Sequence, residues 1–173
     1  ATINRISAVP AMLQVIAEMT GMRFAAVARV TQTTWTACAV LDNLGFGLQP
    51  GGELELVSTL CFESMHSHQP IIIDHASADP LYQHHHTPRM YRFESYITIP
   101  VWRTDGRFFG TLCALDPEPA SLKDSTIQST MESFARLLSL QIDAEENQQR
   151  TETALLQERE NAELREQFIA VIG

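Results

Sequence analysis

The alternation of side chains is most regular between Ser95 and Pro119, where two apolar runs flank the pair Asp105-Gly106. An Asp-Gly pair between runs of β-branched and aromatic residues predicts a β-hairpin, because both residues tolerate the positive φ of tight turns. Neither face of either predicted strand is polar. An antiparallel sheet with one face in water would alternate apolar and polar positions, so we expect both faces of this hairpin to be covered.

Upstream of the hairpin, apolar residues first recur at helical spacing and then alternate with small residues over two short runs, before a stretch rich in glycine. Helical spacing predicts a helix, and short alternating runs predict strands. Glycine clusters are typical of loops. We therefore expect a helix from Ile3 or Pro10 to Thr20, strands at 24–31 and 34–41, and a loop at 44–52.

The middle of the chain is less regular. Residues 53–69 have helical spacing that ends before a proline, and residues 70–75 form an apolar run typical of a short strand. Residues 78–93 hold two prolines and three consecutive histidines without a clean period. There we expect a short helix from about Pro80, a loop through Thr87-Pro88 and one more helical turn, lying together across one face of the sheet.

The last part of the chain has no proline or glycine between residues 122 and 172, which predicts one long helix of roughly 75 Å. Its first half carries a broad apolar stripe that can cover the sheet, whereas residues 143–153 contain a single apolar residue. Apolar positions resume at Leu155 without a regular heptad. Such a helix buries no face by itself, so we expect it to pair with a second copy. Its irregular register suits either a signalling switch or an imperfect spacer.

The composition narrows the possible partners. A chain of 173 residues with 45% hydrophobic content can form one domain and an appendage. Its net charge of −9 argues against nucleic acid and against an anionic membrane surface. No apolar run approaches 18 residues and no signal segment opens the chain, so we expect a cytoplasmic protein. Cys38, Cys61 and Cys113 are odd in number and lie in apolar runs, which indicates buried reduced thiols.

The order of the predicted elements resembles the GAF domain, a small-molecule sensory module with a central antiparallel sheet. Three stretches carry the resemblance: PIIIDHASADP, SYITIPVW and DGRFFGTLCALDPEP. It covers about residues 3–142 and implies an α+β fold, with the sheet covered by helices on both faces and followed by a long C-terminal signalling helix. The final stretch LREQFIAVIG resembles the start of the dimerisation helix of a histidine kinase, in which the phospho-accepting histidine comes next.

These resemblances imply a GAF sensory domain at residues 1–142 and a coiled-coil linker at 143–173. The implied function is that of a sensing domain of a two-component sensor histidine kinase, dimeric through its N- and C-terminal helices. A response regulator would be a partner only through the kinase core that this chain lacks, and we expect no enzymatic activity here. Two alternatives remain open: a ligand-free dimerisation and scaffolding module, and a free-methionine sulfoxide reductase that uses the GAF fold with cysteines.

The resemblance places a ligand pocket between the sheet and the irregular segment at 78–93. Aromatic walls with a few polar groups suit a small molecule whose identity the sequence does not give. No catalytic residue is expected, and no cofactor is required. The candidate pocket residues are Trp35, Cys38, Cys61, Asp74, Tyr82, His84, His85, His86, Tyr91, Phe93, Tyr96, Thr98 and Cys113.

The histidine run 84–86 raises the question of a metal ion or haem. Adjacent residues on a helix point about 100° apart, so three in a row do not converge on one ion, and we expect no metal site. Relatives that attach bilin through the GAF domain use a cysteine in the α segment, but none occurs between Cys61 and Cys113. Covalent bilin is therefore not expected. Asp74 and Asp79 could anchor a cationic or hydroxylated ligand, or cap the turns that follow them.

Overall fold

The computed structural model describes residue 3 and residues 6–173. Its six strands form one antiparallel sheet in the order β3-β2-β1-β6-β5-β4. The strands are β1 (Phe24–Val30), β2 (Thr34–Asp42), β3 (Glu53–Glu55), β4 (Ile71–Ile73), β5 (Ser95–Trp102) and β6 (Phe108–Asp116). The helices are α1 (Val9–Thr20), α2 (Cys61–Ser67), α3 (His86–Tyr91) and α4 (Ser125–Ile172), with 3-10 turns η2 (Leu56–Ser58) and η3 (Ala76–Ala78).

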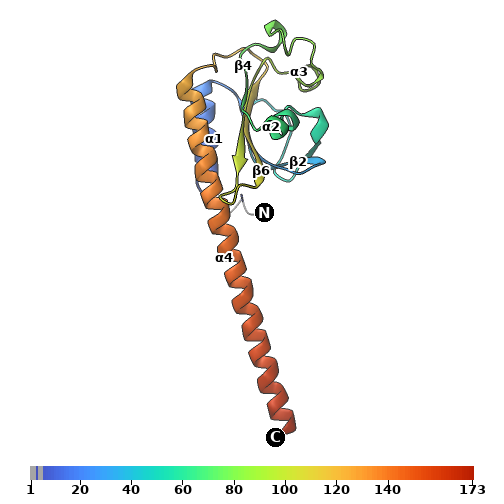
Figure 1. Ribbon diagram of the computed structural model, residues 1–173, viewed down its shortest axis with the longest axis vertical. Helices are drawn as coiled ribbons and strands as arrows, with labels where there is room; N and C mark the ends of the chain where they lie inside the picture. Colours follow the sequence, from blue (N-terminus) through green and yellow to red (C-terminus); the bar gives the residue numbers. More distant parts are fainter. Residues whose placement is uncertain (1–2, 4–5) are drawn as a thin grey trace.

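The sheet is covered on both faces, which confirms the predicted α+β class. Helices α1 and α4 lie side by side against one face, and α2 and α3 lie on the other (Figure 1). We call these the helix face and the pocket face. The first helix begins at Val9, not at Ile3, and residues 4–5 of the longer predicted version lie outside the described residues.

The central hairpin forms as predicted, with every residue of β5 except Trp102 and every residue of β6 except Phe108 buried. Its turn is longer than expected. Only Gly106 has a positive φ, of 85°, and the Arg103 N–H donates to the Arg107 carbonyl at 2.7 Å. This corresponds to a three-residue loop closed by a glycine in the left-handed region, instead of a turn with both Asp105 and Gly106 in that region.

Residues 53–69 do not form the single helix that their spacing predicts. Glu53–Glu55 pair with β2 as an edge strand, and α2 begins only at Cys61. Thr59 interrupts the helical course with extended backbone, at φ −108° and ψ 149°. The prediction was wrong because a strand of three residues is too short to show alternation.

The irregular segment also differs in detail. The predicted loop at Thr87-Pro88 is instead the first turn of α3, where proline is tolerated because its missing N–H would have no partner. The helix predicted from Pro80 is a series of turns over residues 80–84. The segment lies on the pocket face, as expected (Figure 1).

Two residues of β6 explain how this strand pairs with β1. A Cβ atom at Gly110 would lie 1.9 Å from the Ala28 carbonyl oxygen on β1, so only glycine fits there. At the end of the strand, Asp116 accepts hydrogen bonds from Arg23 Nε at 2.9 Å and Arg23 Nη2 at 2.8 Å. This bidentate ion pair joins β6 to the start of β1.

Helix α4 is continuous over 48 residues, close to the predicted span, and begins where the Asp124 side chain accepts the Thr126 N–H. Its first half packs on the sheet, and it then projects far beyond the domain (Figure 1). Arg103 at the hairpin tip contacts Asp143 and Glu146, with Arg103 Nη2 2.6 Å from Glu146 Oε1. Residues 151–173 are exposed throughout. No described helix is long and apolar enough to span a membrane.

Candidate functional site

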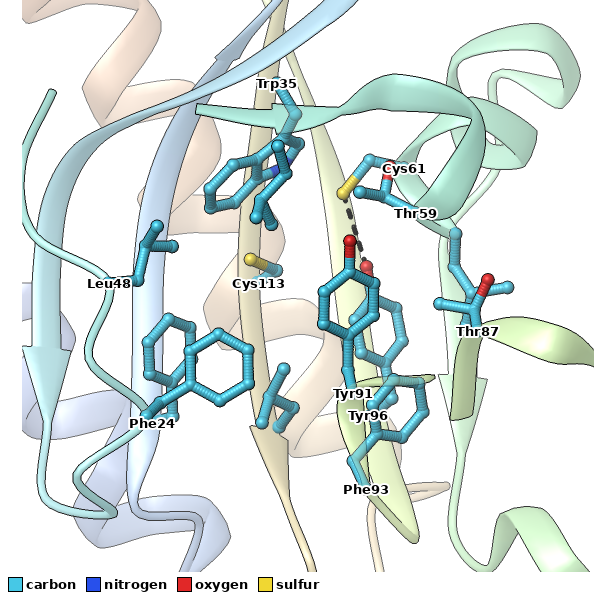
Figure 2. Close-up of a pocket in the computed structure, with 14 residues that line it drawn as sticks. Phe24, Trp35, Leu48, Thr59, Cys61, Thr87, Tyr91, Phe93, Tyr96 and Cys113 are labelled. Carbon is cyan, nitrogen blue, oxygen red and sulfur yellow. Dashed lines mark hydrogen bonds between the residues drawn. The ribbon is translucent and has the colours of Figure 1, made fainter. Parts of the chain in front are cut away.

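The pocket face encloses a cavity of about 40 Å³ between the sheet, α2 and α3. Strands β1, β2, β5 and β6 form its floor, and the loop after β2 closes one side. Figure 2 shows aromatic rings from several of these elements turned toward one another around it. The lining residues are Phe24, Trp35, Phe46, Leu48, Leu54, Thr59, Leu60, Cys61, Thr87, Tyr91, Phe93, Tyr96, Cys113 and Leu115.

Six of the candidate residues meet in this wall: Trp35, Cys61, Tyr91, Phe93, Tyr96 and Cys113. The sequence reasoning missed Phe24 and Leu115, which face each other across β1 and β6. Strand alternation places Leu115 on the same face as Cys113, so that signal was present in the sequence. Phe46 and Leu48 belong to the glycine-rich loop, where no periodicity indicates which way a side chain points.

The histidine run does not line the cavity. His84 is exposed, and His85 lies at the start of α3, where its Nδ1 accepts the Thr87 N–H and its Nε2 contacts Glu63 at 2.8 Å. His86 Nε2 lies 3.3 Å from the Val57 carbonyl oxygen. These rings therefore tie α3 to α2 and η2 on the outer side. Among the described residues, no group of three or more His, Cys, Asp or Glu side chains could hold a metal ion.

Four other candidates also lie outside the wall. Tyr82 borders a separate surface hollow beside α3. Cys38 occupies a bulge between β1 and β2 and packs against the helix-face core. Thr98 is fully buried behind Cys61, 3.9 Å from its sulfur. Asp74 accepts the N–H groups of Leu122 and Lys123 and so holds the segment that leads into α4.

Cys61 is the most chemically distinctive group in the wall. Its Sγ lies 3.3 Å from the hydroxyls of both Tyr96 and Thr111 (Figure 2 draws the contact with Tyr96). The neighbouring Cys113 thiol and the surrounding hydroxyls stabilise the anionic form of Cys61. Together they outweigh burial and lower the pKa of Cys61. The same interaction, together with burial, raises the pKa of Cys113 well above its usual value. The site thus presents a thiol that is only 2% exposed and whose pKa is lowered by its neighbours.

The remaining wall is apolar and uncharged. None of its residues is Lys, Arg, Asp, Glu or His. A cavity of this size is close to the volume of one water molecule, about 30 Å³ in the liquid, so a larger guest requires part of the wall to move. The arrangement suits a small, mostly apolar molecule held beside a thiol.

The sequence profile of the GAF domain family matches residues 4–142. This chain belongs to the GAF domain family. The GAF domain of an Acinetobacter phosphoenolpyruvate-protein phosphotransferase matches with TM-score 0.64 and 13% identity over 86% of this chain and 95% of that chain. None of the curated proteins compared matches.

Two further solved GAF structures have this fold. Free methionine-R-sulfoxide reductase from Neisseria meningitidis, in complex with its substrate, matches with TM-score 0.63 and 16% identity over 85% of this chain and 81% of that chain. The GAF domain of a two-component sensor histidine kinase from Bacillus halodurans matches with TM-score 0.60 and 13% identity over 80% of this chain and 92% of that chain. At such identities the likeness shows the fold alone.

Proposed function

We propose that this GAF domain is the regulatory module of a sensor histidine kinase, binding a small ligand and passing the change to α4. The observation that carries the proposal is the placement of an aromatic cavity on one face of the sheet and a projecting helix on the other. The stretch LREQFIAVIG at the end of α4, similar to the start of a kinase dimerisation helix, supports the kinase context. A response regulator would then be the partner of the kinase core.

Strands β5 and β6 connect the two faces. Tyr96 and Cys113 line the cavity, while their neighbours Ile97 and Leu112 belong to the core beneath α1 and α4. A ligand that displaces Tyr96 would shift the strand on which both sets lie. Arg103, at the far end of β5, would transmit that shift to α4 through its carboxylate partners.

The module would act as a dimer through α1 and α4. On the distal part of α4, large apolar side chains including Leu156 and Phe168 are more than half exposed, at 60% and 67%. A helix that exposes such residues is stabilised by pairing with a second copy. Light scattering at tens of micromolar should give the mass of a dimer, and a monomer at that concentration would contradict this part of the proposal.

Ligand binding is tested by a screen of cell metabolites, using native mass spectrometry and hydrogen exchange. A bound mass is expected, with slower exchange at Tyr96 and Cys113 and altered exchange in α4. If no compound binds and pocket exchange never changes, the domain is better described as a ligand-free dimerisation module. Cys113→Ser alters the cavity wall and should weaken binding of a compound found in the screen, whereas its matched control Cys38→Ser, altered on the helix face, should not.

A second candidate function, reduction of free methionine sulfoxide, is favoured by one observation. Cys61 borders the cavity, and its neighbours lower its pKa, as a nucleophilic thiol requires. The wall has no charged side chain to bind the ammonium and carboxylate of an amino acid, which argues the other way. Turnover of free methionine-R-sulfoxide with a thiol reductant that disappears in Cys61→Ser would establish the reductase, and no turnover would exclude it.

A further inference from the structure

The indole nitrogen of Trp35, a residue of the cavity wall, lacks a hydrogen-bond partner. Among the described residues, Trp35 Nε1 is one of two buried side-chain nitrogen or oxygen atoms without a hydrogen bond. The Trp35 side chain is 3% exposed. Figure 2 shows the ring turned into the group of lining side chains. Indole can only donate, so whatever satisfies this group must be an acceptor.

The hydroxyl groups of the wall, in contrast to the indole N–H, already have hydrogen-bond partners. Thr59 Oγ1 donates to the Leu56 carbonyl at 2.8 Å, and Thr87 Oγ1 donates to the Ser58 carbonyl at 2.9 Å. The Tyr91 hydroxyl lies 2.5 Å from Ser58 Oγ. A buried donor without a partner carries its full desolvation cost, and native proteins retain few of them. The Trp35 N–H has almost no exposed surface of its own, so it becomes a directional contact for a guest only when part of the wall moves.

The charge of the wall restricts the guest further. A carboxylate or phosphate in this cavity would be buried without a cation, because no lining residue is basic. An ammonium group would find no carboxylate in the lining, and the Cys61 sulfur is already in contact with the hydroxyls of Tyr96 and Thr111. The guest must therefore be neutral.

The shape of the wall favours a flat molecule. Phe24 and Phe46 lie with ring centroids 5.1 Å apart, and Phe93 and Tyr96 stack at 5.1 Å. Aromatic walls of this kind gain from offset or edge contacts with another ring. The part of the wall without helix or strand is the loop at 43–52, which carries Phe46 and is anchored at its start by hydrogen bonds to the Asp42 carboxylate.

We propose that the cavity takes a neutral, planar aromatic molecule with one hydrogen-bond acceptor, which accepts from Trp35 Nε1–H while the loop at 43–52 moves to make room. This rests on the proposed function, and it specifies the class of ligand for the same site. A ligand of this class differs from an anionic metabolite and from an amino acid, both of which carry charge.

Three probes of similar size test the proposal: benzonitrile, ethynylbenzene and benzoate. Benzonitrile and ethynylbenzene have the same linear shape, but only the nitrile is a good acceptor, and benzoate adds a charge. The chain has two tryptophans, so the indole N–H resonances of Trp35 and Trp102 can be followed together by heteronuclear NMR. Trp102 packs against His68 and Phe108, away from the cavity, and serves as the internal reference.

We expect benzonitrile to shift the Trp35 resonance and to bind about tenfold more tightly than ethynylbenzene, as one additional hydrogen bond to a buried donor would produce. Benzoate should leave both resonances unchanged. In Trp35→Phe the two neutral probes should bind equally, while Trp102→Phe should keep the difference. The Trp102 resonance also reports whether the Trp35→Phe variant has folded.

Equal binding of the two neutral probes to the unaltered chain would overturn the proposed acceptor contact. Tighter binding of benzoate would overturn the neutral class and leave the sensory function intact. If no probe shifts Trp35 while a charged metabolite from the screen binds the pocket, this inference fails and the proposed function stands. If neither the probes nor the metabolites bind, both fail.

Discussion

The two faces of the central sheet are built from the same strands but covered in different ways. The helix face buries aliphatic side chains such as Ile97, Ile99 and Leu112 beneath two helices that pack along it. The pocket face buries two thiols, several hydroxyls and an unpaired indole N–H beneath short helices and a loop. One face is assembled for close packing, and the other keeps polar groups and space.

This difference shows where stability and function reside in the domain. Burial of aliphatic side chains against long helices leaves few ways to rearrange, so the helix face should set most of the unfolding free energy. The pocket face contains short elements, and its coverings include the glycine-rich loop at 43–52. Such regions open at lower cost, as a binding site requires. The predictions below test this division, beginning with the largest effect.

Two leucines on β6 compare the faces directly. Leu112 is fully buried on the helix face, and Leu115 borders the cavity on the other. We expect Leu112→Ala to lower the unfolding free energy by about 4 kcal/mol and Leu115→Ala by about 2 kcal/mol, because a site that can relax loses less. Urea denaturation measures both. Equal losses, or a larger loss at Leu115, would show that the two faces are packed alike.

Asp116 serves both faces, since its ion pair with Arg23 holds β6 to β1. The Asp116 side chain is 5% exposed while that of Arg23 is 46% exposed. We therefore expect Asp116→Asn to lower the unfolding free energy by about 2 kcal/mol. Burial opposes ionisation of Asp116, but hydrogen bonds from Arg23 and Glu118 prevail and lower the pKa of the carboxyl.

The sign of the pH dependence follows from that lowered pKa. The contribution of Asp116 is fully present above its unfolded pKa, about 3.9, and is lost as the pH falls through the lower folded pKa. Unfolding of the unaltered chain and of Asp116→Asn should therefore converge in acid. Asp105→Asn is the control: its carboxylate pairs with Arg107 at the exposed hairpin turn, where solvent screens the pair, so no measurable change in stability is expected. A pH-independent gap between the unaltered chain and Asp116→Asn would contradict the assignment.

The same contrast explains what the sequence could predict. Periodicity identified β5, β6 and α4, because long elements buried on one or both faces must repeat their apolar positions. The bulge at Cys38 could not be predicted, because it depends on how β1 and β2 align. The orientation of His84–His86 depended on where α3 begins, and a one-residue change in that start turns a side chain by about 100°.

The pocket was predicted less well than the fold for a related reason. Aromatic and histidine residues were assigned to it by chemical type, yet half of its wall is ordinary apolar side chains such as Phe24, Leu54 and Leu60. Residue type indicates what a group can do, whereas its direction is set by tertiary packing. Strand residues were placed more reliably because alternation fixes the side of the sheet.

Arg103 tests whether α4 is fastened independently of the pocket. Its guanidinium is 14% exposed and contacts Asp143 and Glu146, so we expect Arg103→Ala to lower the unfolding free energy by about 1 kcal/mol. Amide exchange should become faster in α4 near residue 143 and stay unchanged around the cavity. Arg107→Ala removes a more exposed cation from the same hairpin and should change neither quantity. Faster exchange at Tyr96 in Arg103→Ala would mean that the Arg103 contacts also stabilise the pocket face when no ligand is bound.

The smallest effect on folding is expected in the distal part of α4, which packs against neither face of the sheet. Leu156 lies in the part of α4 that is exposed throughout, and it contributes nothing to either core. Leu156→Ser should therefore change the unfolding free energy of the domain core by less than about 0.5 kcal/mol. If α4 pairs with a second copy, the same substitution should still weaken the dimer, because it removes apolar surface that pairing would bury. Sedimentation equilibrium separates these two quantities. If the dissociation constant is unchanged in both Leu156→Ser and Leu164→Ser, the distal helix is not the dimer interface. The dimer would then form through α1 and the first half of α4.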